Sequence, residues 1–433
     1  MERWMVGKRT VIVGLDGVPY GLIKKLTEDG VMPNTGKITQ EGIFRQMTSS
    51  IPEISSVAWS SIITGANPGE HGIFGFTELS EGSYRLSFPN FTNLKAKPFW
   101  KIQPNKKSAI INVPSTYPAE RLNGILIAGF VALDPNKAIY PPSLIEELKK
   151  LDYRIDVNAK QAHQSKELFL RNLNNTLEAR IATYRHLWDK EDWDYFMLVF
   201  TSTDRLSHFL WDAYEEKSHR YHSFFLNYLR RIDEVIGEID EQAAKRNYDK
   251  LVLLSDHGFE RLNKMIYVNK YLRDCGFLKL KDIPAKSFND IENGTVAFAL
   301  DPGRIYLNIE GKYPRGSVKR SETDKVIEKL VETFKNFTVD AEPVINQIYH
   351  KEEIYEGALV DRAPDLVLMP NAGFDLKANI KTDKLWDNSA FTGKHTYDDA
   401  FLLVKCLPSS ESKGYCNSAI PEKVNVSDII KII

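Results

Sequence analysis

The sequence predicts an α/β protein with a central, mostly parallel sheet flanked by helices and with a smaller inserted region. Two apolar runs, Thr10–Leu15 and Leu251–Leu254, have the composition of buried strands, and each is followed within two residues by an aspartate. Amphipathic patterns over 165–186 and 218–246 predict long helices that cover such a sheet. In folds of this class, ligands bind beyond the carboxyl ends of the strands.

Composition bounds the possible functions. The 433 residues, of which 42% are hydrophobic, are enough for a large core. The 57 basic residues nearly balance the 58 acidic ones, so the charge gives no indication of a nucleic-acid polymer or an acidic membrane as partner. We expect a small-molecule substrate instead. The sequence does not fix the oligomeric state.

Cysteine usage and hydropathy predict a cytoplasmic protein. Cys275, Cys406 and Cys416 are widely spaced and contain no CxxC pair, which predicts neither a disulfide framework nor a thiolate zinc site. The N-terminus enters a strand without a leader-like apolar stretch, and no later segment has a membrane-spanning length of about 18 apolar residues.

The first strand is predicted at Thr10–Leu15 and is followed by Asp16, Gly17 and a helix over 20–27. Asp16 therefore lies at the carboxyl end of a strand. Such an aspartate either caps the following helix or serves a site at that edge of the sheet.

A strand over 42–47 precedes a loop and a helix that begins at Ser55 or Ser56 and ends at Gly65. The helix dipole and the free N–H groups of the first turn favour an alkoxide or a phosphate, so a serine there suits nucleophilic chemistry. For an isolated serine, a helix N-cap is the commoner role.

The strand at 251–254 ends in Ser255, Asp256, His257 and Gly258. An adjacent carboxylate and imidazole at a strand end can bind one divalent cation. The alternative is that Asp256 caps a helix and His257 is an ordinary loop residue.

Together these segments resemble the alkaline phosphatase superfamily, and more closely its type I phosphodiesterase and nucleotide pyrophosphatase branch. The matching residues are Gly14, Asp16, Gly17, Ser55, Thr64, Gly65, Asn67, Pro68, Gly69, His71, Gly72, Ile73, Asp256, His257 and Gly258. The resemblance also requires an aspartate followed four residues later by a histidine, and a late Gly-x-His sequence.

Both required patterns occur. Asp204 and His208 follow an apolar strand at 193–200 and lie one turn apart if a helix begins near Thr203, so they can share a metal ion. Gly393 and His395 supply the late pattern, before a strand at 400–404. Each pair alone would more often be an ordinary hydrogen-bonding or loop feature.

The resemblance implies a site with two divalent metal ions, zinc or alternatively manganese. One metal would be bound by Asp204, His208 and His395, and the other by Asp16, Asp256 and His257, with the hydroxyl of Ser55 on this second ion. Ser55 would form a phosphoserine intermediate that water then hydrolyses. Ser56 is the neighbouring alternative nucleophile.

Three departures from the family pattern concern the residues around Ser55. Ala58 stands where members of this branch typically have an asparagine that donates to a phosphoryl oxygen. The nucleophile is serine where many of these enzymes have threonine. No sulfatase-type C/S-x-P-x-R sequence surrounds Ser55, so a phosphate ester is the better substrate class.

The remaining segments predict the domain organisation and the rim of the pocket. Residues 1–260 and 385–433 are expected to form the catalytic α/β core, with an inserted cap at 261–384. Asn112 and Tyr117 are predicted to line the substrate rim, although turns at strand ends explain them equally well.

We therefore predict a metal-dependent phosphoesterase that cleaves phosphodiester or pyrophosphate bonds. The alternatives are a phosphomonoesterase or phosphotransferase of the same fold, or a ligand-binding relative without turnover.

Overall fold

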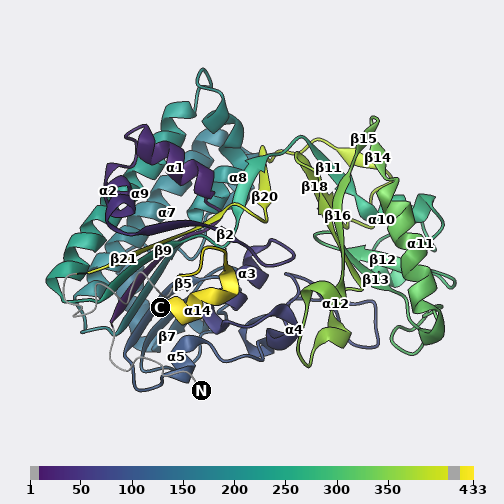
Figure 1. The fold of residues 1–433 in the computed structure, drawn as a ribbon, viewed down its shortest axis with the longest axis horizontal. Helices are drawn as coiled ribbons and strands as arrows, with labels where there is room; N and C mark the ends of the chain where they lie inside the picture. Colours follow the sequence, from purple (N-terminus) through teal and green to yellow (C-terminus); the bar gives the residue numbers. More distant parts are fainter. Residues whose placement is uncertain (1–8, 408–419) are drawn as a thin grey trace. The chain divides into compact units, whose positions relative to one another are not determined.

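The computed structural model describes residues 9–407 and 420–433. The chain forms two compact units (Figure 1). Unit 1 comprises Met1–Ala66, Asn90–Phe259 and His395–Ile433, and unit 2 comprises Asn67–Pro89 and Glu260–Lys394. The strands β10 (Gly258–Arg261) and β20 (Gly393–Thr396), where the chain passes between the units, pair with each other.

Unit 1 is built on a nine-stranded sheet with the order β22-β2-β21-β9-β1-β8-β5-β6-β7. Its strands are β1 (Thr10–Leu15), β2 (Ile43–Thr48), β5 (Ser108–Val113), β6 (Gly124–Ala128), β7 (Ile139–Tyr140), β8 (Tyr195–Phe200), β9 (Lys250–Leu254), β21 (Ala400–Cys406) and β22 (Val424–Asn425). The run from β9 through β1, β8 and β5 to β6 is parallel, whereas β21 and β7 pair antiparallel. The predicted mostly parallel sheet is confirmed.

Helices cover both faces of this sheet. They include α1 (Tyr20–Glu28), α2 (Pro33–Glu41), α3 (Ser55–Thr64), α5 (Phe99–Ile102), α6 (Ile145–Lys150), α7 (Lys166–Trp188), α8 (Ser202–Glu215), α9 (His222–Lys245) and α14 (Ile429–Ile432). Figure 1 shows α1, α2, α7 and α9 on one face and α3 and α14 on the other.

The local sequence explains these elements. Every residue of β1 is buried, as expected for a strand with helices on both sides. In α9 the buried residues include Phe225, Leu229, Ile232 and Ile236, which recur at helical spacing and form one apolar face. The periodicity of the sequence therefore predicts both the type and the buried face of these elements.

The buried carboxylate of Asp233 joins helix α9 to the first turn of helix α2. Asp233 of α9 accepts hydrogen bonds from the backbone N of Asn34 (3.0 Å) and Thr35 (2.7 Å), and from the side chains of the same two residues (3.0 and 2.7 Å). It thereby satisfies N–H groups in the first turn of α2 that have no partner within the helix.

We expect Asp233→Ala to lower the free energy of unfolding by about 3 kcal/mol, because it leaves several buried donors without an acceptor. Urea denaturation followed by circular dichroism measures this loss. The matched control is Glu234→Ala, which removes an exposed ion pair with Arg231 and is expected to cost less than about 0.5 kcal/mol. Equal effects of the two substitutions would contradict the assignment of Asp233 as the cap of α2.

Unit 2 contains a four-stranded antiparallel sheet with the order β12-β13-β17-β16 and a three-stranded sheet with the order β18-β11-β19. Its elements include α4 (Pro68–His71), β3 (Glu78–Leu79), β4 (Leu86–Ser87), β11 (Lys264–Tyr267), α10 (Val268–Asp274), β12 (Ala297–Leu300), β13 (Arg304–Leu307), α11 (Thr323–Lys335), β14 (Thr338–Val339), β15 (Glu342–Pro343), β16 (Ile345–His350), α12 (Lys351–Ile354), β17 (Leu366–Pro370), β18 (Phe374–Lys377) and β19 (Trp386–Asp387).

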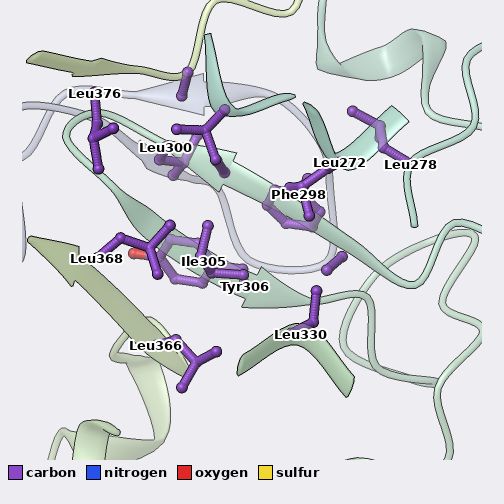
Figure 2. Close-up of a cluster of buried hydrophobic side chains, with 14 of the residues drawn as sticks. Leu272, Leu278, Phe298, Leu300, Ile305, Tyr306, Leu330, Leu366, Leu368 and Leu376 are labelled. Atoms are coloured by element: carbon purple, nitrogen blue, oxygen red, sulfur yellow. The ribbon is translucent and has the colours of Figure 1, made fainter. Parts of the chain in front are cut away.

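Unit 2 has a hydrophobic core of its own. Phe298 of β12, Ile305 of β13, Leu330 of α11 and Leu368 of β17 are buried in one cluster, which Figure 2 shows in close-up. Because both sheets and α10 and α11 contribute to this cluster, unit 2 is a separately packed body rather than an extended loop.

The observed unit 2 differs from the predicted insertion at 261–384 in three ways. It begins at Glu260, it extends to Lys394, and it includes Asn67–Pro89. The segment Asn67–Pro89 belongs to unit 2 because its side chains and backbone bond to later residues of that unit. Arg304 donates to the carbonyl of Thr77 (2.8 Å), and the hydroxyl of Tyr84 donates to the Oδ1 of Asn308 (2.7 Å). No compositional change in the sequence marks such contacts.

The described residues test the cysteine prediction only at one position. Cys275 is free and exposed. Cys416 lies outside the described residues. The predicted absence of a disulfide framework and of a thiolate zinc site stays a prediction.

Within the described residues, each helix is either too short or too polar to cross a bilayer.

Candidate two-metal site

Seven polar residues predicted from the sequence come together in unit 1, at one edge of the central sheet. They are Asp16, Ser55, Asp204, His208, Asp256, His257 and His395. The strands β9, β1 and β8 are neighbours and run parallel, so the residues that follow each of them meet at the same edge. This topology explains why positions so far apart in the sequence converge.

Asp204 and His208 lie in the first half of α8, which begins directly after β8. The Oδ1 atom of Asp204 is 3.4 Å from the Nε2 of His208 and 3.1 Å from the Nε2 of His395. The Nε2 atoms of the two histidines are themselves 3.1 Å apart. The predicted helix therefore presents both side chains on one face, and His395 from β20 completes the group.

Asp16, Asp256 and His257 form the second group, around Ser55. The Nε2 of His257 is 3.8 Å from the Oδ1 of Asp16 and 3.4 Å from the Oδ2 of Asp256. The imidazole rings of His257 and His395 stack with centroids 3.7 Å apart, so the two groups are contiguous.

Ser55 is the first residue of α3 and is 2% exposed. Its Oγ donates a hydrogen bond to the Oδ1 of Asp16 (3.2 Å) and lies 3.2 Å from the Nε2 of His257. The hydroxyl of the adjacent Ser56 is buried and makes no hydrogen bond within the described part of the chain. Of the two serines, Ser55 is therefore the one whose hydroxyl contacts both a carboxylate and an imidazole of the site.

Burial and mutual repulsion shift the titration of these groups. Burial raises the pKa of Asp256 to about 7, and it raises the pKa of Asp16 well above the usual range, with added repulsion from Asp256 and Asp204. Burial also lowers the pKa of His257 well below its usual value. Burial disfavours the charged form of each of these three groups, so ionising the two carboxylates is unfavourable unless positive charge is nearby.

Asp204 behaves differently from the other two carboxylates. Burial would raise its pKa, but His208, His395 and Arg205 outweigh that effect and hold it below the usual range. Burial likewise opposes the charged form of His395, yet the hydrogen bond to Asp204 raises the pKa of this histidine. The ionised form of Asp204 is thus stabilised by its basic neighbours, unlike that of Asp16 or Asp256.

These side chains fit divalent metal ions. Ligand atoms of Asp204, His208 and His395 lie within 4.8 Å of one another, as do those of Asp16, Asp204 and His257. The Oδ2 of Asp256 is buried and accepts no hydrogen bond from the described residues. Mixed oxygen and nitrogen donors suit zinc, and a cation would keep the buried carboxylates ionised.

Surrounding groups orient these side chains. The backbone N of Gly17 donates to the Oδ1 of Asp256 (3.0 Å), and the Nδ1 of His395 lies 2.9 Å from the carbonyl oxygen of Glu53. Gly17 has a φ of 65°, a value that favours glycine and explains this residue in the Asp-Gly turn. Such hydrogen bonds fix the orientation of metal-ligating groups.

Trp59 also holds a site residue in place. Its indole Nε1 donates to the Oδ2 of Asp16 (3.0 Å), and a Cβ atom at Gly14 would collide with the ring. The glycine in the strand is therefore needed for the tryptophan to reach the carboxylate.

We expect Trp59→Phe to lower kcat/KM for a phosphate ester by about tenfold or more, because the carboxylate of Asp16 loses its orienting donor. Steady-state kinetics with metal analysis measures the effect. The matched control is Trp193→Phe, which removes an indole that donates to the carbonyl of Leu187 (2.9 Å), outside the site. Similar losses of activity in both variants would contradict a specific role for Trp59.

The structure does not bring Asn112 and Tyr117 into the group of seven. Asn112 is fully buried, and its side chain donates to the Oγ1 of Thr201 (2.9 Å) and accepts from the hydroxyl of Tyr153 (3.1 Å). Tyr117 is partly exposed, and its backbone carbonyl accepts a hydrogen bond from Phe91 (2.8 Å). Their role at a substrate rim stays a prediction.

Sequence reasoning missed Trp59, Glu53 and Arg205 as neighbours of the site. The Nη1 of Arg205 donates to the Oδ2 of Asp204 (3.3 Å), and its Nη2 donates to the Oδ2 of Asp156 (2.8 Å). For Arg205 the sequence offered one indication, because this arginine directly follows the candidate metal ligand Asp204 in a stretch with few other charged residues.

Comparisons with known proteins place this geometry in context. A family model described as type I phosphodiesterase / nucleotide pyrophosphatase matches residues 10–398. No significant match was found among curated protein sequences.

Several solved structures share the fold. Phosphonoacetate hydrolase from Sinorhizobium meliloti 1021, in complex with phosphonoacetate, is 16% identical with a TM-score of 0.63, covering 98% of this chain and 94% of that chain. Murine ectonucleotide pyrophosphatase / phosphodiesterase 5, an inactive variant in complex with AMP, is 15% identical with a TM-score of 0.55 and the same coverage. The human counterpart is 15% identical with a TM-score of 0.55, covering 98% and 93%. At these identities the likeness concerns the fold.

Proposed function

Since the chain belongs to the type I phosphodiesterase / nucleotide pyrophosphatase family, we propose that it hydrolyses phosphodiester or pyrophosphate bonds through a phosphoserine intermediate on Ser55. The observation that carries this proposal is the position of the Ser55 Oγ, 3.2 Å from both the Oδ1 of Asp16 and the Nε2 of His257, at the first residue of a helix.

Two divalent ions would be held by the same residues. Asp204, His208 and His395 would bind one ion. Asp16, Asp256 and His257 would bind the other together with Ser55, since His257 lies 3.8 Å from Asp16 and 3.4 Å from Asp256. Zinc is the expected metal, with manganese as the alternative. When bound, such ions supply Lewis-acid stabilisation of the negative charge on the attacking and leaving oxygens.

The residues of the chain carry the bond changes as follows. The Oγ of Ser55 gives up its proton and forms a bond to phosphorus as the bond from phosphorus to the leaving oxygen breaks, and the leaving oxygen takes up a proton. Water then gives up a proton and attacks the phosphorus of the phosphoserine. The bond from phosphorus to Oγ breaks, Oγ takes up a proton, and the phosphate product leaves. The dipole and N–H groups at the start of α3 favour the negative charge that develops near Ser55.

The relatives support a small phosphorus-containing substrate. Their ligands, AMP and phosphonoacetate, are small molecules with a phosphate or phosphonate group. Ala58 carries no donor for a phosphoryl oxygen, and this departure keeps a phosphomonoesterase or phosphotransferase as the second candidate. The cytoplasmic location predicted from the sequence stays a prediction.

The test compares bis(p-nitrophenyl) phosphate with p-nitrophenyl phosphate on the metal-loaded protein. We expect a higher kcat/KM for the diester. A preference for the monoester would support the second candidate, and transfer to an added alcohol without release of phosphate would indicate a phosphotransferase. Absence of turnover with either ester and with a pyrophosphate substrate would contradict an enzymatic role.

A further inference from the structure

A pocket of about 610 Å³ lies in unit 1 beside the candidate site. Its walls include Phe130 and Val131 from the loop after β6, Ile145 and Leu148 from α6, and Ile155. The volume lies within the range of small-molecule sites, roughly 300–1,000 Å³, and the predominance of apolar walls is typical of such sites. Nothing in the proposed mechanism uses this space.

Arg205 connects this pocket to the site. It lines the pocket, yet its Nη1 donates to the Oδ2 of Asp204 (3.3 Å). Its guanidinium also lies over the ring of Phe130, 5.0 Å from the centroid, and is held by Asp156. The pocket is therefore one side chain away from a carboxylate that is a candidate metal ligand.

The loop after β6 has a second connection to the reacting end of α3. The backbone N of Ser115 donates to the carbonyl of Phe130 (3.3 Å), and the hydroxyl of Ser115 contacts the carbonyl of Ser56 (3.5 Å). Ser56 directly follows Ser55. The loop that forms one wall of the pocket is therefore joined through Ser115 to the residue next to Ser55.

The open end of the pocket is apolar as well. Val131 is 59% exposed, and the neighbouring Leu133 is 83% exposed. The mouth of the pocket therefore offers apolar as well as polar surface to a ligand. Arg205 forms both a wall of this pocket and a hydrogen bond to Asp204, so a substituent of a substrate bound at the site is the ligand nearest to the pocket.

We propose that this pocket binds an apolar aryl or alkyl substituent of the phosphate ester and so selects esters of apolar alcohols. This inference rests on the proposed function, because it places phosphorus at Ser55. On this proposal a methyl group does not reach the pocket, whereas a phenyl or butyl group does.

The test measures affinity by isothermal titration calorimetry on the metal-loaded protein, with methylphosphonate, butylphosphonate and phenylphosphonate. Each probe is a phosphonate with a single carbon substituent. The three probes therefore differ only in the group that the pocket would bind. We expect affinity to rise by about fourfold for each methylene that enters the pocket. Phenylphosphonate is expected to bind about tenfold or more tightly than methylphosphonate.

Ala132→Phe fills the pocket from a partly exposed wall position, so the fold is expected to tolerate it. In this variant the gain for phenylphosphonate should disappear while methylphosphonate binds as before. The matched control is Leu133→Phe, which adds a ring at the next position, outside the pocket lining, and should leave the gain intact.

Two results would overturn the inference alone: equal affinity for all three probes in the wild type, or a full phenyl gain in Ala132→Phe. If methylphosphonate fails to bind and no phosphate ester is hydrolysed, the proposed function falls and this inference falls with it. The two failures are thereby distinguished.

Discussion

Replacing Ser55 with alanine is expected to lower kcat/KM by on the order of 10⁴-fold or more, because the variant has no nucleophile to form the covalent intermediate. The substitution removes one buried oxygen that contacts Asp16 and His257, while all the carboxylates and imidazoles remain. We therefore expect the variant to keep its metal and its fold. Steady-state kinetics, metal analysis and thermal unfolding measure these three properties.

The covalent step has a direct readout as well. Acid quenching during turnover, followed by mass spectrometry of proteolytic peptides, should show a phosphoryl adduct on the peptide that contains Ser55. Ser56→Ala is the matched control, because it removes the adjacent buried hydroxyl, which makes no hydrogen bond within the described residues. We expect it to retain activity within about tenfold. An unchanged rate in Ser55→Ala, or an adduct on Ser56, would contradict the assignment of the nucleophile.

Loss of the metal ions is expected to have the second largest effect. Dialysis against a chelator should reduce turnover by about 10³-fold or more, since the ions stabilise charge on both reacting oxygens. Adding back zinc or manganese one at a time, with metal content measured for each, identifies the metal that restores activity.

His395→Ala tests the metal group that lies on α8 and β20. Its Nε2 lies 3.1 Å from both the Oδ1 of Asp204 and the Nε2 of His208, so its removal should lower metal content and activity together. The control is His186→Ala, because His186 pairs with Glu147 at the surface of unit 1. Full activity after exhaustive metal removal would contradict a metal-dependent mechanism.

Much of the fold was accessible from the sequence because the core elements have strong local patterns. The run Thr10–Leu15 predicts β1 with the observed bounds, and the region from Ser55 to Gly65 predicts α3 and its end. In each case burial imposes a regular spacing of apolar residues, which the sequence displays directly. Element boundaries at polar turns, such as Asp16-Gly17, were likewise visible.

The residues of the candidate site were identifiable for a different reason. Asp16, Asp204 and Asp256 each follow an apolar strand, and parallel strands bring such positions to one edge. Family resemblance then supplied the grouping of the seven side chains. The sequence could not supply the partners around them, because Trp59 and Arg205 reach the site only through the packing of α3 and α8.

The sequence by itself determined the type of fold, the order of its main elements and the chemical identity of the groups at the strand ends. These properties depend on local periodicity and on residue type. Only the tertiary structure decided that Asn67–Pro89 packs with unit 2, that Asn112 is buried and that an apolar pocket is lined by Arg205, which donates to Asp204. Each of these depends on distances between residues far apart in the chain, and local sequence patterns do not encode such distances.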